Sequence, residues 1–178
     1  AAGTAKKNSV AYGGAVFADY STGSVTDVSR ESMLTFHITK DMIYSGNTVS
    51  SNMTEISPYY DGYGYHSTDL TAGGFLFLDR GASATFDIDE NKTLTIGTVD
   101  TTGDTDGIAS SIPNIGAKTN GGIPASLKKE GLGTLVINSS LEKFYGTVTV
   151  SAGELSVTKP WTLHGAVTVA GGTLRAEN

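Results

Sequence analysis

The feature that most constrains the fold of this chain is a five-residue pattern that occurs five times in its last third. Each copy begins with glycine and carries apolar residues at its third and fifth positions. The copies occupy 133–137, 146–150, 153–157, 165–169 and 172–176. The starting glycines lie 13, 7, 12 and 7 positions apart, so one short and one long step make a period of about 19 to 20 residues. Apolar alternation within each copy predicts a β-strand with one buried face.

A period of this length is typical of a β-solenoid with two strands in each rung. We therefore expect an all-β, right-handed parallel β-helix of about 19 to 20 residues per rung, with the handedness that parallel crossovers generally show. Glycine suits the corners because it adopts positive φ without a steric penalty. The apolar residues of the pattern should point inward and stack in columns about 4.8 Å apart. They are Leu135, Ile137, Val148, Val150, Leu155, Val157, Val167, Val169 and Leu174.

Strand-like segments continue upstream with less regular spacing. They lie at 13–18, 32–38, 42–47, 74–77, 85–88 and 93–96. Phe75 and Leu94 are again 19 positions apart, which suggests that the same repeat continues there with larger side chains. One elongated domain is expected over residues 1–178. Its parts are irregular rungs at 1–72, further rungs at 73–97, a loop excursion at 98–126 and the regular repeat at 127–178.

Composition excludes several classes of function. The net charge is −6 and the 12 lysines and arginines form no patch, so binding to nucleic acid is not expected. The chain has no cysteine, which excludes disulfides and thiolate metal sites. Residues 172–176 are followed by no polar cap, so we expect a fragment of a longer solenoid whose open end is prone to end-to-end self-association.

Two phrases in the regular part carry a resemblance to a known family. They read LKKEGLGTLVIN at 127–138 and FYGTVTVSAGELSV at 144–157. Both resemble the passenger-associated repeat of bacterial autotransporters, and the match covers 127–176 closely. Residues 73–97 are also similar to passenger sequence. The motifs at 13–16 (GGAV) and 44–47 (YSGN) distantly resemble those of chlamydial polymorphic membrane adhesins, which are themselves autotransporters.

This resemblance implies an extracellular protein displayed at the outer membrane of a Gram-negative bacterium. It also implies that the chain's own C-terminal membrane barrel lies outside these residues. The implied role is adhesion or interaction with host or neighbouring cells, without catalysis, through a host-cell or matrix protein or a glycan. Neither a cofactor nor a metal is implied.

The most aromatic segment of the chain, at 57–66, is the candidate binding site. Tyrosine side chains can stack on sugar rings or anchor a protein contact, and insertions in solenoids often carry such contacts. The alternative is that these rings pack on the flank of the solenoid. The candidate residues are Tyr59, Tyr60, Asp61, Tyr63, Tyr65 and His66.

Three other groups of residues have weaker claims to function. Asp100, Asp104 and Asp106 fit a calcium loop poorly, so a solvated acidic loop is expected there. Asp87 and Asp89 with Lys92 and Arg80 could serve a polysaccharide-cleaving enzyme, but surface charge is the favoured interpretation. The three histidines, His37, His66 and His164, are widely separated, and no nucleophile motif accompanies them.

Two further segments are expected to be structural. Lys128, Lys129 and Glu130 should form a solvated lead-in to a strand, and Trp161 should cover a corner. Three functional classes thus stay open: an adhesion or interaction surface, which is favoured; a structural stalk that presents a distal domain; and a polysaccharide-active enzyme.

Overall fold

A computed structural model describes residues 11–18, 32–49, 71–79, 81–103, 105–110, 124–162 and 164–177. Over these residues it contains fifteen β-strands and no helix, so the chain is all-β as the sequence predicts. The strands pair in parallel throughout. The predicted binding segment at 57–66 lies outside the described residues.

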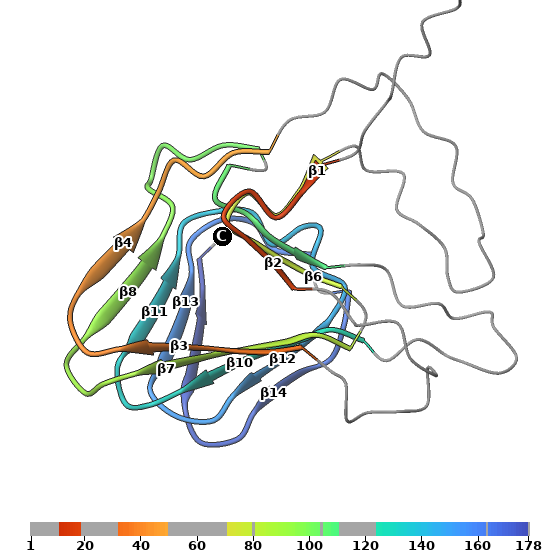
Figure 1. The fold of residues 1–178 in the computed structure, drawn as a ribbon. Coiled ribbons are helices and arrows are strands. Elements are labelled where there is room, and N and C mark those ends of the chain that lie inside the picture. Colours follow the sequence, from red (N-terminus) through yellow and green to blue (C-terminus); the bar gives the residue numbers. More distant parts are fainter. Residues whose placement is uncertain are drawn as a thin grey trace, which may run out of the picture.

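Most strands belong to three parallel sheets that face a common interior (Figure 1). The first sheet contains β3 (Met33–Ile38), β7 (Ser83–Ile88), β10 (Ser126–Glu130), β12 (Thr147–Val150) and β14 (Val167–Val169). The second sheet contains β4 (Met42–Tyr44), β8 (Thr93–Ile96), β11 (Thr134–Ile137), β13 (Glu154–Val157) and β15 (Thr173–Ala176). The third sheet contains β2 (Val16–Ala18), β6 (Leu76–Leu78) and β9 (Ile108–Ser110). A separate pair is formed by β1 (Ala11–Tyr12) and β5 (Thr71–Ala72).

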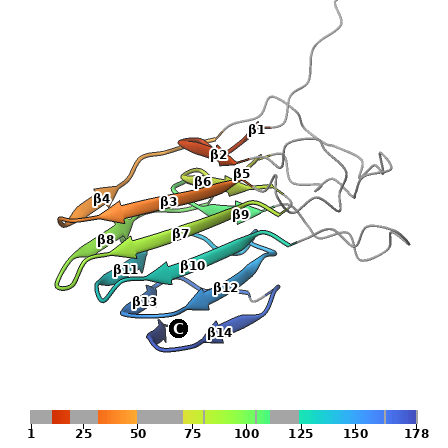
Figure 2. The same cartoon turned by 60° about the horizontal axis from the view of Figure 1, so that its bottom comes forward.

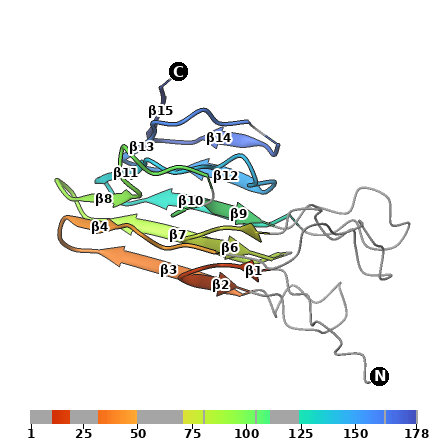
Figure 3. The ribbon, with the colours of Figure 1, turned by 90° about the horizontal axis from the view of Figure 1, so that it is seen from above.

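Successive strands of the chain visit these sheets in a fixed order. A strand of the third sheet is followed by one of the first sheet and then by one of the second sheet, for example β6, β7 and β8. We call such a set of consecutive strands a layer. Figures 2 and 3 show the layers stacked on one another, from β3 and β4 at one end to β14 and β15 at the other. The two layers nearest the C-terminus contain only strands of the first and second sheets.

The glycine-led segments stack as their spacing predicts. Leu135 of β11 pairs with Leu155 of β13, which pairs in turn with Leu174 of β15. The side chains of Leu135, Ile137, Val148, Val150, Leu155 and Val157 are all buried. In the last layer Val167 and Leu174 are only partly buried against the core, and Val169 is 50% exposed. These three residues continue the columns of Val148, Val150 and Leu155 as predicted, but they are less buried because no further layer covers them in the described residues.

The upstream half of the chain departs from the regular period. Leu94 of β8 pairs with Met42 and Leu135, whereas Phe75 lies beside the third sheet, so their 19-residue separation does not mark a stack. Each upstream layer includes a third strand, which lengthens it. One of these strands, β9, falls within the predicted loop excursion at 98–126; its Ile108 and Ala109 are buried. The core there is aromatic, with the rings of Phe36 and Phe86 stacked at 4.8 Å.

The glycines that lead the repeated segments lie where neighbouring layers come too close for a side chain. A Cβ atom on Gly146 would lie 2.3 Å from the carbonyl oxygen of Ala125 in the layer below. At Gly153 the backbone has φ +63, and a Cβ atom would lie 2.2 Å from the carbonyl oxygen of Gly133. Both glycines are therefore needed for the close approach of layers, and Gly153 also for its left-handed backbone.

Replacing a core leucine by aspartate tests this assignment of the buried face. Leu155 is 1% exposed, so Leu155→Asp would bury an unpaired carboxylate and should lower the free energy of unfolding by about 3 kcal/mol or more. Leu132 lies in a turn and is 66% exposed. Leu132→Asp is the matched control and should change stability by less than about 0.5 kcal/mol. Denaturant unfolding measures both, and similar values for the two variants would show that the buried face is assigned wrongly.

Candidate functional site

The six candidate binding residues of the 57–66 segment fall in a stretch, 50–70, that the structure does not describe. Tyr59, Tyr60, Asp61, Tyr63, Tyr65 and His66 therefore stay a prediction from the sequence. The described residues that flank this stretch are Val49 on one side and Thr71, the first residue of β5, on the other.

A buried carboxylate holds the backbone just before this stretch. Asp106 is 1% exposed, and its Oδ2 accepts a hydrogen bond from the backbone N–H of Gly46 at 2.9 Å. Its Oδ1 accepts two from Asn47, from the backbone N–H at 2.7 Å and from Nδ2 at 2.8 Å. The backbone N–H of Asp106 donates to the carbonyl oxygen of Asn47 at 2.8 Å. We call these four contacts the Asp106 clamp.

The Asp106 clamp corrects the expectation of a solvated acidic loop. Asp100 is exposed as expected, and Asp104 lies outside the described residues, but Asp106 is buried and points at backbone amides. Both of its carboxylate oxygens accept hydrogen bonds from N–H groups. The surroundings of Asp106 therefore suit a carboxylate that is held by donors, and not one that coordinates a cation. Its φ of +53 is tolerated because aspartate enters the left-handed region more readily than most residues.

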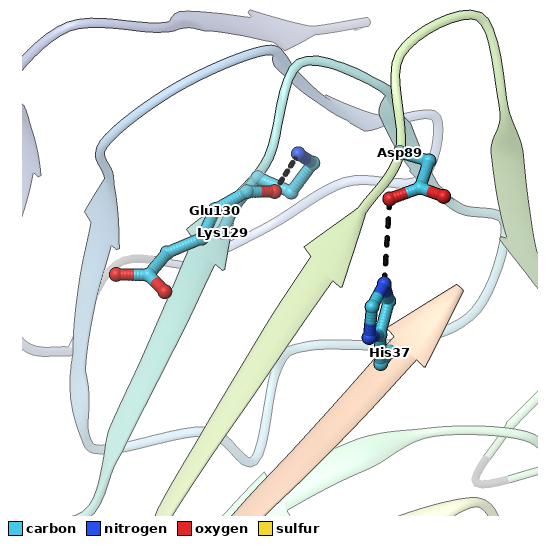
Figure 4. Close-up of polar contacts among 4 residues, drawn as sticks. All are labelled: His37, Asp89, Lys129 and Glu130. Atoms are coloured by element: carbon cyan, nitrogen blue, oxygen red, sulfur yellow. Dashed lines mark hydrogen bonds and ion pairs between the residues drawn. The ribbon is translucent and has the colours of Figure 1, made fainter. Parts of the chain in front are cut away.

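The carboxylates considered for a polysaccharide-cleaving enzyme lie near the turn between the first and second sheets. Asp89 is exposed, and its Oδ1 lies 3.3 Å from Nε2 of His37 on the neighbouring strand (Figure 4). Asp87 points to the outer face of β7, Lys92 is half-buried, and Arg80 lies outside the described residues. An exposed pair such as His37 with Asp89 contributes little to stability.

The segment at 128–130, expected to be solvated, is partly exposed at Lys128 but buried at Lys129. Lys128 points outward and pairs with the carboxylate of Glu130. Lys129, by contrast, points inward and is completely buried, so its expected solvation is wrong. Burial lowers the pKa of Lys129 to about 8, although the nearby charges of Asp87 and Glu130 act in the opposite direction. The alternation of β10 places every second residue inside, and position 129 falls on that face.

The remaining candidates have structural surroundings. The ring of His164 lies 4.4 Å from that of Tyr145, and its Nε2 is 2.9 Å from the carbonyl oxygen of Glu142. Trp161 is partly buried and packs against the hydrophobic core. In the contacts that the structure describes, neither His164 nor Trp161 lies against an acidic side chain or another histidine.

The described part of the chain has no group of three or more histidine or acidic residues arranged to hold a metal ion. Nor do these residues include a helix with the length and hydropathy needed to cross a bilayer. No protein-family model, curated protein or solved structure matches this chain. The likeness of 127–176 to the autotransporter passenger repeat therefore stays a prediction from its motifs.

The Asp106 clamp can be tested with a near-isosteric change. Asp106→Asn turns one acceptor oxygen into an NH₂ group, which would face the N–H of Gly46 or Asn47 and leave buried donors unpaired. The expected loss of unfolding free energy is about 1 to 3 kcal/mol. The exposed Asp100→Asn is the matched control and should change stability by less than about 0.5 kcal/mol. If thermal and denaturant unfolding give equal stabilities for both variants, the clamp does not hold this part of the fold.

Proposed function

We propose that the three parallel sheets are the faces of a right-handed β-helix. Three observations support this. The strands of each layer follow one another through the sheets in a fixed order, the layers stack in register, and residues of all three sheets share one hydrophobic cluster. A right-handed path is the one that parallel crossovers almost always take. In this fold each turn of the chain would be one layer.

On this fold we base the proposal that the chain is part of an autotransporter passenger at the surface of a Gram-negative bacterium. It would act there in adhesion to a host-cell or matrix protein or a glycan, tethered through a membrane barrel outside these residues. The observation that carries the proposal is the stacking of the glycine-led segments of 127–176, because these are the residues that resemble the passenger repeat. Their parallel, in-register pairing is what such a repeat requires.

The binding segment in this proposal is 57–66. It concentrates four tyrosines in ten residues, whereas the outward faces of the regular layers carry mainly hydroxyl and charged side chains. For example, Thr134, Glu154 and Thr173 occupy one outward column. Such polar faces suit a solvated shaft, which supports the alternative that the regular layers form a stalk for a distal domain. The two functions make different predictions for the loss of the aromatic segment.

Replacing residues 57–66 by a glycine-serine linker of equal length distinguishes the adhesion function from the stalk function. Bacteria that display the full chain should attach to host cells or matrix, and the replacement should lower attachment by at least tenfold, because the tyrosines would supply most of the contact. Replacement of 112–118 by a glycine-serine linker of its own length is the control and should leave attachment unchanged. Circular dichroism should show the same β-rich spectrum for all three proteins. Unchanged attachment without 57–66 would contradict the adhesion proposal and favour the stalk.

A further inference from the structure

Lys129 occupies a position that is apolar in the neighbouring strands. Its partners in register are Phe86 of β7 on one side and Val150 of β12 on the other. Both are fully buried, and Lys129 itself is 0% exposed. Fully buried lysines are rare because an ammonium group loses its hydration in the core. The residue before it, Lys128, points outward and offers an ordinary lysine for comparison.

The amine of Lys129 reaches the corners of two successive layers. Nζ donates to the carbonyl oxygen of Glu130 (Figure 4). It also donates to the carbonyl oxygen of Gly131, at 2.8 Å, in the turn after β10. It also lies 3.5 Å from the carbonyl oxygen of Ala152, at the turn after β12. The left-handed backbone of Gly131, with φ +68, forms part of the turn that directs these carbonyls inward. One side chain therefore connects the corner of its own layer to that of the next.

No carboxylate within the described residues lies at ion-pair distance from this amine. Asp87 of β7 is on the outer face. Figure 4 shows that the carbonyl group of Glu130 points toward Nζ and that its carboxylate points away from it. The carboxylate of Glu130 pairs with Lys128 instead. On β13, Glu154 has its carboxylate 3.6 Å from Arg175, and β12 contributes no charged residue. The direct hydrogen-bond partners of the ammonium group are therefore carbonyl oxygens, and the charges of Asp87 and Glu130 act on it only from a distance.

We propose that Lys129 is a proton-sensitive brace: it joins two successive corners as an ammonium ion, and the fold gains stability when it releases its proton. The partners named above support this, since neutral acceptors compensate an ammonium ion less well than a carboxylate would. The lowered pKa of Lys129 agrees with this arrangement, because desolvation is its largest cause.

The direction of the pH dependence follows from the two protonation equilibria. The pKa of Lys129 is 10.5 in the unfolded chain and about 8 in the folded chain. Between these values the unfolded state binds more protons than the folded state, so stability rises with pH. Below about pH 8 both states are protonated, and this gain is absent. Within the window the folding equilibrium constant should increase by up to about tenfold per pH unit.

Unfolding of the full chain in denaturant from pH 7 to pH 10 tests the proposal. Lys129→Met keeps the length of the side chain and removes its charge, so this variant should be more stable than the parent at pH 7. Its advantage should shrink by at least tenfold in equilibrium constant by pH 10. Lys128→Met is the matched control and should follow the pH dependence of the parent. A pH-independent ratio between Lys129→Met and the parent would overturn the proposal.

A titration of the unsubstituted protein gives a second test that does not depend on how the variants fold. The ¹⁵Nζ or ¹³Cε resonance of Lys129 should titrate with a midpoint near pH 8, well below those of the exposed lysines. A midpoint at or above pH 10 would overturn the proposal whatever the stability of the variants.

Discussion

Backbone hydrogen bonding between strands of successive layers is the interaction on which the rest of this structure depends. It fixes which residues of one layer lie over which residues of the next, as in the column of Leu94, Leu135, Leu155 and Leu174. A shift of one residue would move a whole apolar face into solvent. The glycines are part of this constraint because a side chain at Gly146 or Gly153 would push the layers apart.

The same register explains where buried polar groups occur. Lys129 lies on the inner face because β10 alternates, and its charge is met by carbonyls that the turns leave free. Asp106 lies inside a turn, and its charge is met by the amides of Gly46 and Asn47. In both places backbone groups, rather than a charged side chain, satisfy the buried ion. Such contacts depend on the exact position of neighbouring layers, so they are sensitive to any change of register.

The sequence predicts the regular part of the fold well and the irregular part poorly. Residues 133–157 combine glycine spacing with strict alternation, so both the strands of the repeat and their buried apolar positions could be predicted. β9 could not, because its three residues show no alternation and its partner β6 lies more than thirty residues upstream. Burial of Asp106 was missed because it depends on Gly46 and Asn47, which are distant in sequence. Burial of Lys129 follows from the alternation of β10, and it was missed because lysine is usually an exposed residue. The tyrosine segment stays a prediction.

The in-register stacking of layers can be measured directly because the chain has no cysteine of its own. Thr35 of β3 and Thr85 of β7 are outward-facing partners. Their Cα atoms should be about 4.8 Å apart, within the range that a disulfide spans. The double variant Thr35→Cys with Thr85→Cys should form an intramolecular disulfide rapidly under mild oxidation. Pairing Thr35→Cys with Ser83→Cys or Asp87→Cys, each about 8 Å away, should not. Equal cross-linking in all three, or preference for a shifted pair, would contradict the proposed register.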